Sequence, residues 1–212
     1  MYKTITNNPV ERQQVTYPWT YWDNIFSDVE LKKMCKYFDT QGVERGTTVN
    51  ADGTQTVDEK IRVSNLKFYC HDVSNENTAW IFQRINQVVE LANNTYYNFD
   101  LNGYSFFQYT EYDASEKGRY DFHTDTIFGS GLATDMIEPR KLSVTVCINE
   151  PGIEYEGGEF QINMGNEKKA ATIETKKGRM IIFPSFMIHR VAPITKGRRK
   201  SIVAWVTGPK FI

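Results

Sequence analysis

The stretch RKLSVTVCIN, residues 140–149, alternates apolar and polar side chains, and this pattern predicts a β-strand with one buried face. Leu142, Val144, Val146 and Ile148 fall on that face, because successive side chains of a strand point to opposite sides of the sheet. Similar strand-like runs, separated by turn residues, lie on both sides of this stretch. They cover residues 104–112, 119–124, 159–163, 171–175, 179–184, 189–193 and 199–207.

About eight strands at this spacing favour a sandwich or a barrel, and we expect a double-sheet jelly roll, or double-stranded β-helix. The predicted fold class is mainly β (α+β), with a jelly-roll core buttressed by N-terminal helices. Residues 101–212 would form that core. Residues 1–100 would supply an N-terminal arm and the supporting helices, and both parts belong to one integrated domain. The arm, residues 1–20, is expected to be extended and to dock through Trp19 and Trp22.

Two helices are predicted before residue 100. Ser27 and Glu30 have the spacing of a capping box that opens the first helix, and Gly42 is expected to end it. The second helix is expected to begin near Asn77 and to end at Asn93 and Asn94. Between them, residues 42–60 read as a polar loop or hairpin. The apolar stripes are Leu31, Met34, Cys35 and Phe38 in the first helix, and Ile81, Ile85, Val88, Val89 and Ala92 in the second.

The composition is that of an ordinary globular protein. The chain has 212 residues, 40% of them hydrophobic and 24% charged, with a formal net charge of −1. A net charge so close to zero gives no general electrostatic reason to expect nucleic acid or an anionic membrane as partner. The three cysteines are widely spaced without a CxxC pair, which suits a reducing compartment. With no apolar leader or membrane-length apolar run, we expect a cytoplasmic protein. The sequence does not specify the oligomeric state.

Two of the three histidines are candidate metal ligands. His123 and Asp125 are two positions apart at the end of a strand-like run, so both can point to one side of the sheet. His189 follows another strand. Two histidines and one carboxylate on one face of a metal, with open positions opposite, are typical of non-haem Fe(II) oxygenases. An HxD pair or a single histidine carries little weight alone, and His71 is interpreted as structural.

A second pattern follows His189. Residues 195–197 read as a turn, after which Arg199, Ser201, Val203 and Trp205 fall on one face of a strand. An arginine beside a serine can hold a carboxylate through a guanidinium fork and a hydroxyl. The competing interpretation is a solvated basic turn, which we expect for Lys196, Arg198 and Lys200 instead.

Together these segments resemble the catalytic core of the 2-oxoglutarate/Fe(II) oxygenase superfamily, and within it the prolyl 4-hydroxylase-like group that includes the bacterial PKHD-type hydroxylases. The resemblance extends from about Tyr104 to Trp205. It consists of six sequence motifs whose order and spacing are more specific than any one motif alone. The pieces are QYTEY (108–112), RYDFHTD (119–125), RKLSVTVCIN (140–149), YEGGEF (155–160), GRMIIFPS (178–185) and HRVAPITKGRRKS (189–201).

The resemblance implies a role for each matching residue. His123, Asp125 and His189 match the iron ligands. Arg199 matches the residue that binds the C5 carboxylate of 2-oxoglutarate, and Ser201 matches its partner. His123, Asp125, His189 and Arg199 form the implied catalytic set.

The resemblance also points to four further positions of the co-substrate pocket. Tyr112 is similar to a tyrosine that contacts 2-oxoglutarate, and Tyr120 is its rival. Trp205 matches a tryptophan near the iron. Cys147 stands where several relatives carry a tyrosine that binds 2-oxoglutarate, so this chain departs from the pattern there.

The implied activity is hydroxylation of an unactivated C–H with O2, releasing succinate and CO2, with ascorbate as reductant. Retention of Asp125 favours hydroxylation over halogenation. The expected substrate is a peptide or protein side chain, with proline the first candidate, although the sequence shows no charged anchor for a peptide motif. Residues 126–140 are expected to be a lid, and a passive surface loop is the competing interpretation.

Three other functions stay open. A free amino acid or another small molecule could be the substrate. Nucleic-acid demethylation is disfavoured, because that branch of the superfamily carries a second arginine where this chain has Trp205. A non-catalytic jelly-roll module that binds zinc or a ligand would leave Arg199 and Ser201 without a purpose.

Overall fold

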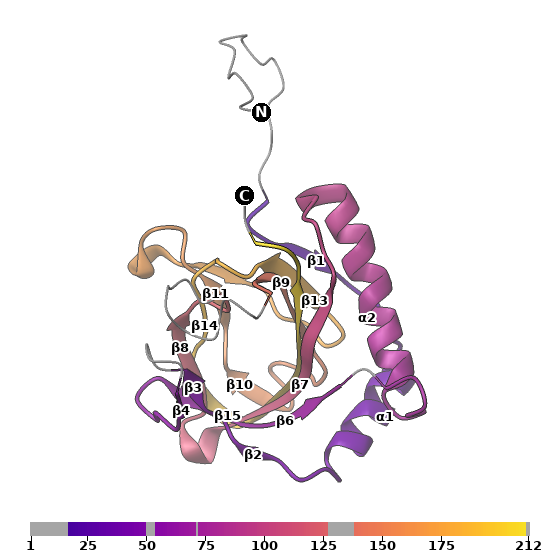
Figure 1. The fold of residues 1–212 in the computed structure, drawn as a ribbon. Helices are drawn as coiled ribbons and strands as arrows, with labels where there is room; N and C mark the ends of the chain where they lie inside the picture. Colours follow the sequence, from indigo (N-terminus) through magenta and orange to yellow (C-terminus); the bar gives the residue numbers. More distant parts are fainter. Residues whose placement is uncertain (1–16, 50–53, 71, 127–137, 211–212) are drawn as a thin grey trace, which may run out of the picture.

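Two antiparallel sheets face each other in the computed structural model, which describes residues 17–49, 54–70, 72–126 and 138–210 (Figure 1). The larger sheet has the order β1 (Thr20–Trp22), β13 (Met180–Pro184), β9 (Arg140–Cys147), β15 (Ile194–Thr207), β7 (Gly103–Asp113), β6 (Asn65–Tyr69) and β2 (Glu44–Arg45), and β10 (Tyr155–Gly157) pairs with β15. The smaller sheet has the order β12 (Ala171–Ile173), β11 (Phe160–Ile162), β14 (His189–Val191), β8 (Arg119–His123) and β5 (Arg62–Val63). This arrangement confirms the predicted jelly roll.

Helix α1 (Asp28–Phe38) begins at the predicted capping box. The Ser27 hydroxyl accepts a hydrogen bond from the Glu30 amide, and the Glu30 carboxylate accepts one from the Ser27 amide. The predicted end at Gly42 is wrong. The helix ends at Phe38, and the amide of Asp39, the C-cap residue in right-handed geometry, bonds to the last turn, so a left-handed glycine is not needed.

Helix α2 (Ala79–Ala92) carries the predicted stripe, of which Ile81, Ile85, Val89 and Ala92 are buried. Its α-helical part ends at the C-cap residue Asn93, as predicted. The backbone continues in a π-helical segment, η1 (Asn93–Tyr97), and stops at Asn98, which adopts a left-handed conformation with φ of 54°. Figure 1 shows α1 and α2 on the outer side of the larger sheet, across from the smaller sheet.

The alternation of β9 places its side chains in two different environments. Leu142, Val144, Val146 and Ile148 lie in the cluster between the larger sheet and the helices, as predicted. Cys147 lies in the second cluster, between the two sheets, with Phe160 and Phe183. Polar side chains on this inner face of β9 are therefore available to a site between the sheets.

The predicted turn at residues 195–197 is wrong. Strand β15 begins at Ile194 and runs through these residues, because β10 pairs with it there and places Tyr155 opposite Gly197. Gly197 has a φ of 66°, and a Cβ atom at this position would lie 2.1 Å from the carbonyl oxygen of Glu154. The bend and the close backbone approach thus require glycine, while the strand continues.

The N-terminal part of the chain contributes strands as well as helices. Strands β5 and β6 join the smaller and the larger sheet, and β3 (Thr48–Val49) pairs with β4 (Gln55–Thr56) within the region predicted as a loop or hairpin. The division at residue 101 stays a prediction. Trp22 packs on the helix-side cluster and Trp19 on the cluster between the sheets.

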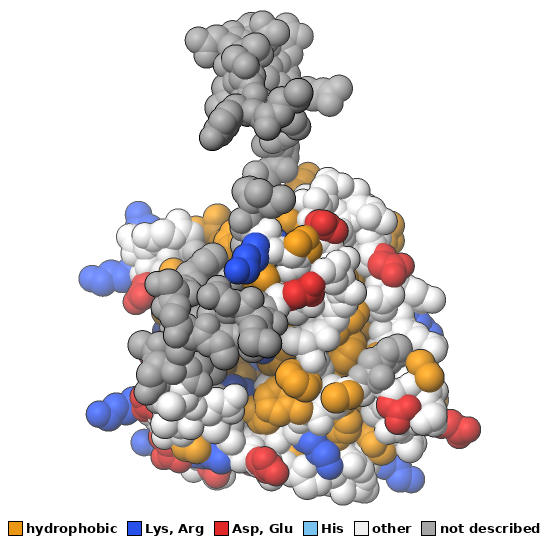
Figure 2. Space-filling model, in the orientation of Figure 1, with side chains coloured by type: hydrophobic (Ala, Val, Ile, Leu, Met, Phe, Trp, Pro, Cys, Tyr) orange, Lys and Arg blue, Asp and Glu red, His pale blue; other side chains and the backbone are white. Residues whose placement is uncertain are grey.

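Acidic and basic side chains are interspersed over the face of the molecule drawn in Figure 2, without a field of one sign. None of the described helices has the length and apolar character needed to cross a membrane. Most of the predicted lid at residues 126–140, most of the N-terminal arm and His71 lie outside the described residues.

Candidate metal centre

His123 and His189 come together because their strands pair directly. Strand β8 ends at His123, strand β14 begins at His189, and the two residues are opposite each other in the antiparallel register. Residues opposite each other on such a pair point to the same face of the sheet. The imidazole centroids are consequently 4.2 Å apart.

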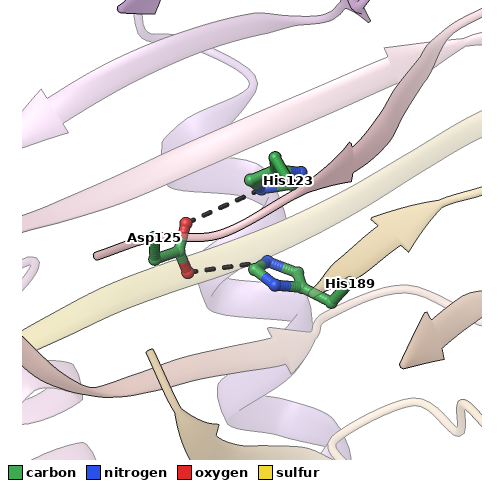
Figure 3. A group of neighbouring side chains, drawn as sticks. All are labelled: His123, Asp125 and His189. Atoms are coloured by element: carbon green, nitrogen blue, oxygen red, sulfur yellow. Dashed lines mark ion pairs between the residues drawn. The ribbon is translucent and has the colours of Figure 1, made fainter. Parts of the chain in front are cut away.

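Asp125 completes the group (Figure 3). Its Oδ1 atom lies 3.6 Å from His123 Nε2, and its Oδ2 atom lies 3.5 Å from His189 Nε2. One ligand atom from each of the three residues lies within 4.8 Å of the others. Figure 3 shows the carboxylate turned toward both rings. The predicted candidate ligands therefore form a His–Asp–His cluster that could hold one metal ion.

Backbone carbonyls fix which imidazole nitrogens can bind a metal. His123 Nδ1 lies 2.7 Å from the carbonyl oxygen of Asp121, and His189 Nδ1 lies 2.9 Å from that of Met187. A carbonyl oxygen only accepts hydrogen bonds, so each Nδ1 carries the proton in the neutral ring. The lone pair of each ring is then on Nε2, the atom that faces Asp125, as in metal sites where the second nitrogen is held by a carbonyl.

The charge state of the cluster also suits a cation. Burial, with repulsion from His123, lowers the pKa of His189 to about 4, so this imidazole is neutral at neutral pH. Burial alone would raise the pKa of Asp125, but His189, His123 and Arg140 outweigh it and hold the pKa below its ordinary value. The site thus offers two imidazole nitrogens and one carboxylate, the donor set of an Fe(II) facial triad.

Two serines hold the Asp125 carboxylate in place. The Ser143 hydroxyl, on the inner face of β9, donates to Asp125 Oδ2 over 2.6 Å and lies 2.8 Å from the Ser185 hydroxyl. The Asp125 amide donates to the Ser185 carbonyl over 2.9 Å. The sequence analysis did not single out either serine, although the alternation of residues 140–149 already placed Ser143 opposite the apolar face.

Arg199 faces the interior between the sheets. Its side chain is 1% exposed, and its Nη1 donates to the Ser201 hydroxyl over 3.1 Å. Its Nε has no hydrogen-bond partner among the residues that the structure describes. The adjacent Arg198 points outward and forms an ion pair of 2.8 Å with Asp113. A buried guanidinium with an unused N–H is a strong site for a carboxylate.

The remaining candidates lie at different distances from Arg199. The guanidinium carbon is 5.7 Å from the ring centroid of Tyr112, its partner in the β15–β7 register. Tyr120 instead stacks on His123, with ring centroids 3.5 Å apart. Cys147 packs between the sheets, where its Sγ lies 3.2 Å from the Tyr155 hydroxyl. Tyr155, which the sequence analysis missed, is 1% exposed and is a hydrogen-bond partner of Arg199.

One cavity of about 570 Å³ joins these groups. The metal cluster, Arg199 and Ser201 line it together with Tyr112, Tyr120 and Trp205. Arg62 and Arg140, also missed in the sequence, line it as well. A small molecule bound to Arg199 would therefore share this cavity with a metal ion held by the His–Asp–His cluster.

The sequence matches one protein-family model. Residues 107–207 match the model described as the 2OG-Fe(II) oxygenase superfamily. A PKHD-type hydroxylase of Alteromonas mediterranea is 33% identical over 93 residues, which are 43% of this chain and 39% of that protein. A PKHD-type hydroxylase of Prochlorococcus marinus is 35% identical over 96 residues, 45% of this chain and 39% of that protein. The chain thus matches well under half the length of these relatives.

Solved structures share the fold at low sequence identity. A prolyl-4-hydroxylase of Pseudomonas putida superposes with a TM-score of 0.70 at 17% identity, covering 92% of this chain and 95% of that chain. A prolyl hydroxylase of Trichoplax adhaerens, solved with a peptide fragment of the hypoxia inducible factor oxygen degradation domain, gives 0.68 at 18% identity, covering 90% and 83%. These similarities establish the arrangement of strands and helices.

Proposed function

Because residues 107–207 belong to the 2OG-Fe(II) oxygenase superfamily, we propose that this protein is an Fe(II)- and 2-oxoglutarate-dependent dioxygenase. The observation that carries the proposal is that one cavity contains both the His–Asp–His cluster and the buried Arg199. A metal site alone fits many proteins. A metal site that shares its cavity with a buried, incompletely bonded guanidinium fits a metal enzyme with a dicarboxylate co-substrate.

The residues present fit both groups. His123 Nε2, His189 Nε2 and one Asp125 oxygen would hold Fe(II), and they leave the side opposite the protein ligands for exchangeable ligands. The unused Nε of Arg199 and the Ser201 hydroxyl would hold the C5 carboxylate of 2-oxoglutarate. Tyr112 is the better candidate for a further contact, because it lies beside Arg199 whereas Tyr120 lies against a metal ligand.

With both groups bound, the site supplies oxidative decarboxylation of 2-oxoglutarate by O2, which yields succinate and CO2 and hydroxylates a C–H bond of the substrate. The chain's own residues orient the reactants. Ser143 and Ser185 keep the Asp125 carboxylate aimed at the metal position, and the two carbonyl-bound Nδ1 protons keep both Nε2 atoms available. Trp205 forms an apolar part of the wall. Ascorbate is the proposed reductant.

The proposed substrate is a prolyl or other amino-acid residue of a peptide or protein. Support comes from relatives named PKHD-type hydroxylases and from structural neighbours named prolyl hydroxylases, one of them solved with a peptide. A free amino acid or other small molecule is the second candidate. Nucleic-acid demethylation stays disfavoured by Trp205, and a non-catalytic module gives no purpose to a buried Arg199 beside a metal cluster.

Succinate formation tests the proposal directly. The purified protein should convert 2-oxoglutarate to succinate slowly in air with Fe(II) and ascorbate, and should do so faster in a peptide extract that contains substrate. Mass spectrometry of the same extract should show a product heavier by one oxygen atom. Wild-type protein that binds metal but forms no succinate above the level of His189→Ala would contradict the proposal.

A further inference from the structure

Two arginines in the cavity have no role in the proposed function so far. Arg62, from β5, is 7% exposed, and Arg140 begins β9. Both line the cavity together with Arg199. Asp125 is the one acidic residue among the described residues of its wall. The cavity is therefore cationic, whereas the outer face in Figure 2 mixes both signs of charge.

Neutral groups satisfy the hydrogen bonds of Arg62 but do not balance its charge. Its Nε donates to the Ser64 hydroxyl over 2.8 Å, and its Nη1 donates to the Thr47 carbonyl over 3.2 Å. The guanidinium carbon lies 4.6 Å from the ring centroid of Tyr120, which itself stacks on His123. No described carboxylate lies within ion-pair distance. A buried charge without a counter-ion is costly unless a ligand supplies one.

Arg140 also lacks a carboxylate partner among the described residues. Its guanidinium carbon lies 4.0 Å from the ring centroid of Trp205, and among the described residues its hydrogen bond is a long one of 3.5 Å to the Asp125 carbonyl. Like Arg62, its guanidinium group lines the cavity close to a metal ligand. Two guanidinium groups from different sheets therefore line the same cavity.

The iron and the co-substrate would not neutralise these charges. The two positive charges of Fe(II) equal the two negative charges of 2-oxoglutarate, and Asp125 balances Arg199. Among the described residues that line the cavity, the charges of Arg62 and Arg140 stay in excess whether or not the metal and co-substrate are bound. The remaining reactant, the substrate, can supply the negative charge that the described lining residues lack.

We propose that the substrate carries a carboxylate, which binds between Arg62 and Arg140 beside Tyr120 and Trp205. The inference rests on the proposed function, because it assigns the substrate to the space left by the metal and co-substrate. A guanidinium group matches the two oxygens of a carboxylate, and a pair of them discriminates strongly against an uncharged amide. The carboxylate can be the side chain of an acidic residue in a peptide or the terminal group of a free amino acid.

A binding experiment with two arms separates these sources. The protein is loaded with Mn(II), which does not support turnover, and with 2-oxoglutarate. One arm offers a pool of N-acetylated, C-amidated proline peptides with glutamate or aspartate, glutamine or asparagine, or phosphoserine beside the proline. The other arm offers free amino acids together with their amides. Mass spectrometry of the retained fraction gives the ratio of each acid to its matched amide.

The expected ratio in wild-type protein is roughly 10-fold or more in favour of the carboxylate in one arm, the factor that corresponds to 1.4 kcal/mol. Arg62→Gln and Arg140→Gln should each bring it close to 1, and the Lys variants should restore part of it. Lys196→Gln is the matched control, since it removes the same charge from an exposed residue that pairs with Glu156. Retention of Mn(II) and 2-oxoglutarate, followed by calorimetry, shows that the variants keep the site.

Preference in the peptide arm identifies an acidic peptide, and preference in the amino-acid arm identifies a small molecule. Equal retention of acids and amides in both arms overturns the inference, as does selective retention of the phosphoserine peptides. Wild-type protein that binds neither Mn(II) nor 2-oxoglutarate would instead refute the proposed function itself, and the inference with it.

Discussion

Arg199 lies directly opposite Tyr112 on the paired strands β15 and β7, while its neighbour Arg198 lies opposite Asp113 and forms an ion pair with it. Neighbouring residues of one strand thus place one guanidinium in the cavity and the other on the surface. This difference allows the role of Arg199 to be tested against a control of the same chemistry.

Arg199→Ala should raise the KM for 2-oxoglutarate greatly, because the change removes a charged contact to a partly desolvated carboxylate, worth about 2 to 5 kcal/mol. Arg199→Lys should recover only part of the affinity, since an ammonium group lacks the fork. Steady-state succinate formation at varied 2-oxoglutarate measures both. Arg198→Ala should change the KM little, and a reversal of the two effects would show that the other arginine binds the co-substrate.

Tyr155→Phe should raise the KM for 2-oxoglutarate several-fold, on the order of the 0.5–1.5 kcal/mol net value of one hydrogen bond, and should leave kcat nearly unchanged. The lost hydroxyl lies 3.2 Å from Cys147 Sγ and is a hydrogen-bond partner of Arg199. Tyr69→Phe is the control, because the buried Tyr69 hydroxyl has no hydrogen-bond partner among the described residues. Equal effects of the two changes would rule out a specific role for Tyr155.

Ser143→Ala should weaken metal binding by about 10- to 100-fold, the usual effect of removing a residue that orients a metal ligand. The Ser143 hydroxyl holds the Asp125 oxygen that faces His189. Mn(II) titration by calorimetry measures the loss. Ser105→Ala removes a hydroxyl that has no partner among the described residues and should leave metal affinity as it is. Unchanged affinity in Ser143→Ala would show that Asp125 does not need this support.

Asp23→Asn should lower the free energy of unfolding at neutral pH by well under 1 kcal/mol, because Asp23 is partly exposed. A hydrogen bond from Arg179 lowers the pKa of Asp23 from its ordinary value of 3.8, so the contribution is present above that value and is lost as pH falls below it. Urea unfolding at neutral pH and near pH 3 should show the difference shrinking, with exposed Glu76→Gln as control. A difference independent of pH would contradict the ion pair.

The metal cluster and the orientation of Arg199 could be predicted because they depend on short-range rules. The spacing of His123 and Asp125 places both at the end of one strand, and the two-residue period separates Arg199 from Arg198. The same two-residue period places Ser143 on the face of its strand opposite the apolar side chains, so its position in the site could also have been predicted.

Other features depend on pairings between distant segments. The turn expected at residues 195–197 is a bent strand because β10 pairs with it, and only that pairing brings Tyr155 against Arg199. Arg62 and Arg140 reach one cavity from strands of different sheets, so nothing local in the sequence joins them. Helix α1 ends before Gly42 because the following residues close its last turn without a left-handed glycine.

The most direct test of the account is anaerobic titration of Fe(II) into wild-type protein and into the variants His123→Ala, Asp125→Ala and His189→Ala, in the presence of 2-oxoglutarate. We predict one saturable Fe(II) site in the wild-type protein and its loss in each variant, with the far-ultraviolet circular dichroism unchanged. Wild-type affinity and stoichiometry retained in His189→Ala would contradict the assignment of the metal centre.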